Sequence, residues 1–152
     1  MFVIKKPYGS DEEHQKCIDR ETENYLNIKH HLIPKYYGKT TNNYIVIEFI
    51  NGNTAKYIND FNLTEFDKLI IILQLLSLFE YLHKNKYVYR DLKPDNIMIN
   101  ENNEFVLIDL DRMIYISDNC NNQEYTKDFQ SLFAAPEINS NNITTACDIF
   151  SI

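Results

Sequence analysis

Apolar and polar positions near the start of the chain predict a short strand followed by a helix. Three apolar residues at 2–4, followed by two lysines, predict a short strand, which Pro7 breaks. Ser10 and Glu13 have the spacing of a capping box, in which two side chains satisfy the free backbone amides at the first turn of a helix. An acidic helix is therefore predicted from this point to about Ile28.

A second strand is predicted at residues 44–50, because a nearly continuous apolar run is typical of a strand covered on both faces. Gly38 is predicted to mark a turn before this run, and Asn51–Asn53 to end it. Further along, Thr64 and Asp67 have capping spacing and precede a helix, 69–82, that should be buried all round. After Tyr87–Tyr89 and a polar, turn-like stretch at 90–96, the remaining predicted segments are hairpin strands at 97–100 and 104–109 with an asparagine-rich turn, and a long loop at 111–130.

The composition excludes several classes of function. The 152 residues are enough for one domain with an ordinary core. Fifteen basic and 22 acidic residues give a net charge of −7, which argues against a nucleic-acid-binding face. The richest apolar stretch, 69–79, is shorter than the roughly 20 residues of a membrane span, and three cysteines without C-x-x-C spacing indicate neither a disulfide framework nor a zinc site. A soluble cytoplasmic protein that binds neither nucleic acid nor membrane is expected.

The densest group of chemically useful side chains lies at 89–96. The sequence Tyr-Arg-Asp-Leu-Lys-Pro-Asp-Asn is followed, thirteen residues after Asn96, by Asp109 in a second acidic segment. Lys-Pro-Asp-Asn alone is a good turn sequence, so Asp91 in isolation would be interpreted as a turn residue. The common register of Asp91 with Lys93, Asn96 and Asp109 favours a functional site over that interpretation.

These motifs resemble those of the eukaryotic-type protein kinases, whose catalytic loop reads H/Y-R-D-x-K-x-x-N and whose metal-binding loop reads D-F-G. Further segments resemble other kinase motifs in the same order: Phe2-Val-Ile-Lys5 the V-A-I-K strand, Ile47-Glu-Phe-Ile50 the segment that links the lobes, Ala135-Pro-Glu137 the A-P-E motif, and 148–152 the start of the long helix that follows. The resemblance covers essentially the whole chain. It implies an α+β fold with two lobes, the N-lobe at 1–49 and the C-lobe at 50–152.

The resemblance also implies Mg²⁺-dependent transfer of the ATP γ-phosphate, and each matching residue has a chemical reason for its place. Asp109 and Asn96 offer oxygen ligands of the kind that Mg²⁺ prefers. Asp91 is the candidate to accept or orient the proton of the attacking hydroxyl. Lys93 would place a positive charge near the transferring phosphate.

Four residues are implied by register to bind the nucleotide. Lys5 and Glu21 match the ion pair that steadies the α- and β-phosphates, and Lys5 fits the register better than Lys6. Taken alone, Lys5 would be a solvated residue at a strand end, and Glu21 would belong to a solvated helix face. Glu48 and Ile50, in the segment that links the lobes, are the other implied nucleotide contacts.

The expected substrate is a protein with a Ser or Thr acceptor, because in the family a lysine at the position of Lys93 is typical of such kinases. Arg90, beside Asp91, is the residue expected to receive a phosphate carried by the activation loop. The candidate hydroxyls for that phosphate are Ser117, Tyr125, Thr126 and Ser131.

Asp111 departs from the family pattern, because it stands where D-F-G has its glycine. A position that tolerates any backbone conformation thus carries a side chain, although Asp adopts positive φ more readily than most residues. The D-x-D sequence is similar to that of small-molecule phosphotransferases of the aminoglycoside and choline kinase type, which share the fold. Lys93-Pro94 and the motif at 135–137 favour a protein kinase over this alternative.

The chain also resembles a kinase domain shortened at both ends. Only four residues precede Lys5, so the first two strands and the glycine-rich loop of the N-lobe are expected to be missing. The C-lobe is expected to stop at the start of its central helix. The strand of Lys5 would then be an exposed sheet edge at which a partner could pair, and the 152 residues alone would be a poor or undetectable kinase. An inactive fragment or pseudokinase that acts as a binding module is the alternative.

Overall fold

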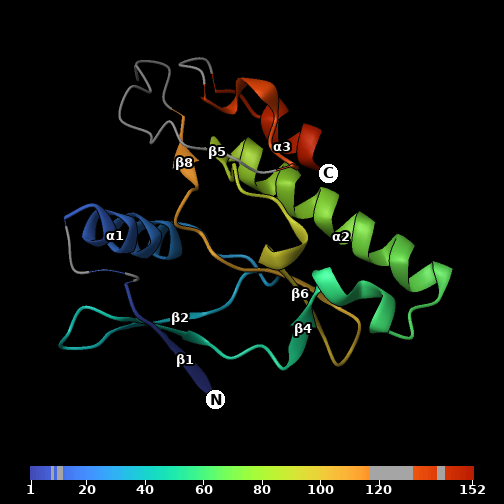
Figure 1. The fold of residues 1–152 in the computed structure, drawn as a ribbon, viewed down its shortest axis with the longest axis horizontal. Coiled ribbons are helices and arrows are strands. Elements are labelled where there is room, and N and C mark those ends of the chain that lie inside the picture. The colour runs from blue at the N-terminus through green and yellow to red at the C-terminus, as the bar shows by residue number, and fades with distance from the viewer. Residues whose placement is uncertain (8, 10–11, 117–131, 140–142) are drawn as a thin grey trace.

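The computed structural model of the protein describes residues 1–7, 9, 12–116, 132–139 and 143–152 (Figure 1). In chain order, the elements are β1 (Phe2–Lys5), α1 (Glu12–Asn27), β2 (Tyr36–Lys39), β3 (Ile45–Glu48), β4 (Gly52–Thr54), α2 (Glu65–Lys84), β5 (Tyr87–Val88), β6 (Ile97–Asn100), β7 (Phe105–Leu107), β8 (Ile114–Tyr115) and α3 (Ala146–Ser151), with 3₁₀ turns at Ala55–Asp60, Pro94–Asn96 and Pro136–Asn139. Antiparallel sheets and separate helices confirm the α+β class. The predicted cap at Ser10 and the four candidate phosphorylation sites at 117–131 lie outside the described residues.

Three antiparallel strands in the order β1–β3–β2 form a sheet beside α1 (Figure 1). β1 lies at the edge of this sheet, and Phe2, Val3 and Ile4 are exposed there. Along β3, Ile45 and Ile47 are buried, whereas the residue that follows each of them is half-buried. The prediction of a strand covered on both faces is therefore wrong. Side chains alternate across a strand, and the described residues fully bury one face of β3.

Two glycines lie within strands, where the sequence predicts a turn and a strand end. Gly38 belongs to β2 and sits at a bulge in the register with β3; its φ of +134° is one that residues with a side chain rarely adopt. Gly52 opens β4 and pairs with Asn100, and a Cβ on Gly52 would lie 2.1 Å from the Ile99 carbonyl oxygen. The prediction of a turn at Gly38 is wrong, because its positive φ belongs to a bulge within a strand. The predicted end of the strand at Asn51–Asn53 is confirmed, because β3 ends at Glu48 and Gly52 begins another strand.

The capping pair predicted for the second helix is confirmed. The Thr64 side chain accepts a hydrogen bond from the Asp67 amide, and the Asp67 carboxylate accepts one from the Thr64 amide. Contrary to the prediction, α2 is not buried all round. Its buried residues are Leu75, Leu78, Phe79 and Leu82, and its residues of 45–68 % exposure are Phe66, Leu69, Ile72, Leu73 and Leu76. Apolar residues thus lie on two sides of α2, and the described part of the chain buries one of these sides. No described helix is both long enough and apolar enough to span a membrane.

The predicted hairpin is confirmed, since β6 and β7 pair in antiparallel register and β4 pairs with the other side of β6. Its turn is built from asparagines. Asn100 Oδ1 accepts hydrogen bonds from the amides of Asn102 and Glu104, and Asn103 has a φ of +59°. Beyond the hairpin, the predicted loop after residue 111 contains a short strand, β8, which pairs with β5.

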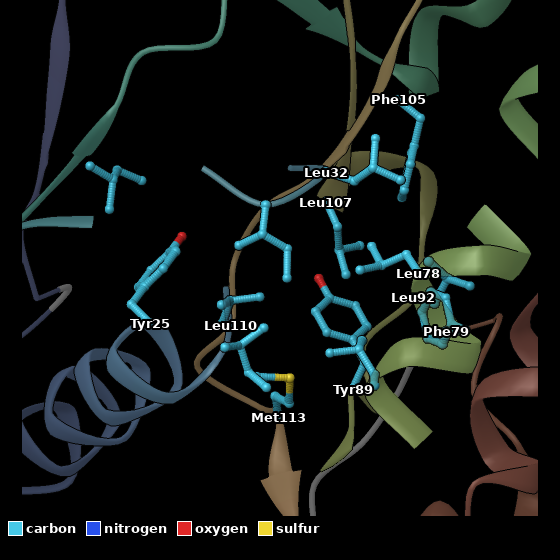
Figure 2. Close-up of a cluster of buried hydrophobic side chains, with 14 of the residues drawn as sticks. Tyr25, Leu32, Leu78, Phe79, Tyr89, Leu92, Phe105, Leu107, Leu110 and Met113 are labelled. Carbon is cyan, nitrogen blue, oxygen red and sulfur yellow. The ribbon is translucent and has the colours of Figure 1, made fainter. Parts of the chain in front are cut away.

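A large cluster of buried side chains joins α1 to α2 (Figure 2). Figure 2 shows Tyr25 of α1 on one side of this core and Phe79 of α2 on the other, with Leu110 and Met113 between them. Tyr89 packs edge-on against Phe79, with 6.0 Å between the ring centroids. Tyr89 and Leu110 belong to the two acidic segments singled out in the sequence. Both segments are therefore anchored in the core through the apolar neighbours of their polar residues.

Candidate active site

The backbone on either side of Arg90 is held by a carboxylate from the C-terminal helix. Asp148 of α3 accepts hydrogen bonds from the Tyr89 amide at 2.9 Å and the Arg90 amide at 2.8 Å, and His83 Nε2 of α2 lies 2.8 Å from the same carboxylate. These bonds support the left-handed conformation of Arg90, whose φ is +73°. No sequence motif identifies His83. Its contact with Asp148 is formed only in the folded chain, where α2 and α3 meet the loop that carries Arg90.

Three donors converge on one oxygen of Asp91, a buried residue. Lys93 Nζ and Asn96 Nδ2 each lie 2.8 Å from Asp91 Oδ2, and Arg112 Nε lies 4.0 Å from it. Asn96 Nδ2 also donates to the Asp91 carbonyl oxygen at 2.9 Å. The structure thus brings together Asp91, Lys93 and Asn96 as the register implied. The contacts named here all use Oδ2 of the Asp91 carboxylate.

Backbone contacts bring Asp109 next to the segment of Asn96. The Ile108 amide donates to the Asn96 carbonyl oxygen at 2.9 Å, and the Tyr89 hydroxyl donates to the Ile108 carbonyl oxygen at 2.6 Å. Asp109 has a φ of +64°. Among the described residues, no three His, Cys, Asp or Glu side chains are grouped as a complete metal cage. The Asp109 carboxylate and the Asn96 amide oxygen are of the ligand type that Mg²⁺ takes, since this ion usually has one or two protein ligands and completes its shell with water and phosphate oxygens.

Lys5, at the end of β1, joins α1 to Asp109. Its Nζ lies 2.8 Å from the Glu21 carboxylate and 2.6 Å from Asp109 Oδ1. Lys6 instead places its Nζ 5.7 Å from the centroid of a tyrosine ring, and Glu23, the other glutamate near this position of α1, is exposed. The contacts therefore join the lysine and glutamate that the register selects.

The pKa of each member of this pair is raised, but the causes differ. Burial opposes the charge on Lys5, but the attraction of Glu21 and Asp109 and hydrogen bonds to both outweigh it, so the pKa of Lys5 is raised. Glu21 is 1 % exposed, and burial raises its pKa to about 7 against the attraction of Lys5. The carboxylate of Glu21 thus depends on Lys5 for its ionised form.

The variant Lys5→Met is expected to destabilise the fold more at pH 8 than at pH 5. Above its ordinary pKa of 4.5, Glu21 loses its proton in the unfolded chain before it does in the fold, so stability falls as the pH rises toward 7. Without Lys5, the pKa of Glu21 rises further and this loss extends to higher pH. At pH 5 Glu21 keeps its proton in the fold with or without Lys5, so the difference is small, whereas at pH 8 the further rise of its pKa costs up to about 1.4 kcal/mol of stability.

Urea unfolding at the two pH values measures this difference. Lys6→Met is the matched control, because the same change at the next position removes no ion pair with Glu21, and its effect should stay within about 0.5 kcal/mol at both pH values. An equal loss for Lys5→Met at pH 5 and pH 8 would show that Glu21 does not titrate as described.

A cavity of about 430 Å³ opens between the β1–β3–β2 sheet and the segments that carry Asp109. Its lining includes Val3, Glu48, Ile50, Met98 and the ion pair of Lys5 and Asp109. An apolar slot with an ammonium and a carboxylate in its lining suits a flat base joined to phosphates. Glu48 and Ile50, the implied nucleotide contacts, both line it.

Asp111 lies at the position where the motif has glycine. Its φ is not positive, so Asp111 does not adopt the left-handed conformation that its sequence position suggested. In this segment the residue with a positive φ is Asp109. Asp111 Oδ1 is buried with no hydrogen-bond partner among the described residues. Burial, and next the charge of Asp109, raise the pKa of Asp111. A second carboxylate is thus held beside Asp109 at an energetic cost.

The chain is similar in sequence to known proteins. The sequence model of the protein kinase domain family matches residues 1–152. A probable serine/threonine-protein kinase of Dictyostelium discoideum is 30 % identical over 98 % of the chain and 26 % of its own length. A MAP kinase kinase of Saccharomyces cerevisiae is 32 % identical over 72 % of the chain and 24 % of its own length. A probable serine/threonine-protein kinase of Clostridium acetobutylicum is 36 % identical over 65 % of the chain and 16 % of its own length. The chain spans about a quarter or less of these relatives.

Proposed function

The chain belongs to the protein kinase domain family, and on this premise we propose that it acts as a serine/threonine-protein kinase that transfers the γ-phosphate of ATP to a protein. The observation that carries the proposal is the position of Lys5, ion-paired to both Glu21 and Asp109 in the lining of an apolar slot. Phosphoryl transfer depends on alignment and charge neutralisation more than on covalent help, and this group of charges supplies both.

Asp109 and Asn96 would hold Mg²⁺, and Lys5 would bind the α- and β-phosphate oxygens. The carboxylate and amide oxygens are suitable ligands for this ion, which, when bound, neutralises charge on the phosphates. Glu21 would keep the ammonium of Lys5 in place. Glu48 and Ile50 would contact the base, because both line the apolar part of the slot.

Asp91 would receive or orient the proton of the attacking hydroxyl. The contacts of Lys93 and Asn96 hold Asp91 Oδ2 in place, so Oδ1 would face the substrate. Lys93 would share its charge between Asp91 and the transferring phosphate. Both roles depend on position, which the Asp148 bonds to the Tyr89 and Arg90 amides support.

The proposed acceptor is a Ser or Thr hydroxyl of a protein, and two facts support it. Lys93 stands at the family position typical of such kinases, and two of the relatives above are described as serine/threonine-protein kinases. We also place the lobe boundary between 49 and 50, because the first sheet is complete at Glu48 and the second begins at Gly52.

Transfer from radiolabelled ATP to a mixture of Ser, Thr and Tyr peptides, an aminoglycoside and choline tests the acceptor class. The proposal expects label on phosphoserine or phosphothreonine, measured with the 152-residue chain and with a longer protein containing it if the rate falls below detection. Label on the aminoglycoside or choline, with none on the peptides, would contradict it and support the small-molecule alternative.

A further inference from the structure

Helix α1 holds the turn after Asp109 through polar contacts to its backbone. Asn24 Nδ2 donates to the Leu110 carbonyl oxygen at 2.7 Å and to the Met113 carbonyl oxygen at 2.9 Å. One turn earlier, Glu21 Oε1 accepts a hydrogen bond from the Leu110 amide at 3.3 Å. A third contact, from Arg20 Nη1 to the Asp111 carbonyl oxygen, measures 3.4 Å. Three side chains of one helix therefore fix the backbone of a segment far away in the sequence.

Asn24 is the residue of this group that another side chain could not easily replace. It is 5 % exposed, and the side chains of Leu110 and Met113 are fully buried. Two carbonyl oxygens require two donors, and the Asn side chain supplies both from one NH₂ group, which also settles the orientation of the amide. A carboxylate would set oxygen against oxygen, and an apolar side chain would leave two buried acceptors without these partners.

The turn is also anchored by the buried side chains of Leu110 and Met113. Its own closure is one hydrogen bond of 3.3 Å, from the Met113 amide to the Leu110 carbonyl oxygen, which is the oxygen that Asn24 also contacts. Asp109 lies at the start of this turn in a left-handed conformation. The position of its carboxylate is thus set by the turn on one side and by the Lys5 ammonium on the other.

We propose that Asn24 is a positioning residue, which fixes the turn at 110–113 and thereby places the Asp109 carboxylate for its cation. The statement about the turn stands on the hydrogen bonds alone, whereas the statement about the cation rests on the proposed function.

Asn24→Leu tests the proposal, because leucine has the same branched arrangement of heavy atoms and lacks both donors. Hydrogen exchange of the Leu110 and Met113 amides is expected to accelerate about tenfold or more, while amides in the middle of α2 keep their rates. Asn27→Leu is the control: it makes the same change at the end of α1, outside the contacts to the turn. Asn24→Ser, which retains one donor, is expected to give an intermediate rate and carries the test if the leucine variant fails to fold.

The second measurement is the affinity for Mn²⁺ in the presence of ADP, followed by electron paramagnetic resonance. Asn24→Leu is expected to weaken it about fivefold or more, and Asn27→Leu to leave it unchanged. Unchanged amide exchange would overturn the role of Asn24 in the turn. Faster exchange with unchanged Mn²⁺ affinity would overturn its positioning of Asp109. If the unaltered protein binds no Mn²⁺, the proposed metal role fails, and the exchange rates still decide whether Asn24 holds the turn.

Discussion

Asp91→Asn is expected to lower turnover by about 10²–10⁴, the range for loss of a positioned acid or base. The change keeps the size of the side chain and removes its negative charge, so the amide can no longer receive the proton of an attacking hydroxyl. It also weakens the attraction to Lys93, whose Nζ lies 2.8 Å from Asp91 Oδ2. Initial rates of label transfer, with circular dichroism to establish that the fold is kept, measure the effect.

Asp95→Asn is the matched control for this experiment. It makes the same chemical change four residues away, at a half-exposed side chain whose ion pair with Lys56 measures 3.2 Å. An exposed pair of this kind contributes little, so the turnover of Asp95→Asn should stay near that of the unaltered protein. If Asp91→Asn also keeps the original rate while the fold is intact, Asp91 has no part in proton transfer.

Asp109→Ala is expected to abolish Mg²⁺-dependent nucleotide binding, whereas Asp111→Gly should retain or improve it. Asp109 is the carboxylate that Lys5 contacts and that lines the slot. Asp111 is the carboxylate with a buried oxygen that lacks a partner among the described residues, and its charge repels that of Asp109. Its replacement by glycine removes both unfavourable features, and no positive φ is needed at that position.

Calorimetric titration of ADP with and without Mg²⁺ separates the two carboxylates. The two variants serve as each other's control, because each removes one acidic group from the same turn. The reverse ranking, with binding lost in Asp111→Gly and kept in Asp109→Ala, would make Asp111 the principal ligand. It would strengthen the interpretation of the D-x-D sequence as that of a small-molecule phosphotransferase.

Structural features formed by residues that lie close together in the sequence could be predicted from the sequence. The Thr64–Asp67 cap and the asparagine turn of the hairpin follow from local hydrogen bonding, which spacing alone reveals. The contact of Lys5 with Glu21 was predictable only through the resemblance to a family, because the two residues belong to different elements. Their roles in binding a nucleotide remain predictions.

Contacts between distant segments left no signal in the sequence. Asn24 and His83 act on backbone and carboxylate groups that lie 65 or more positions away, so no short spacing marks them. The burial of α2 was overestimated for a related reason. An apolar helix indicates that burial is favourable, but the described chain covers one of its faces.

The most direct measurement of the central claim is a titration of the protein with Mg-ATP followed by amide chemical shifts, which detects even millimolar affinity. The proposed site predicts saturable shifts at residues that line the slot, among them Val3, Ile50 and Asp109. These shifts should be lost in Lys5→Met and kept in Lys6→Met. Shifts that are absent from the slot, or that persist unchanged in Lys5→Met, would contradict the assignment of this slot as the nucleotide site of a kinase.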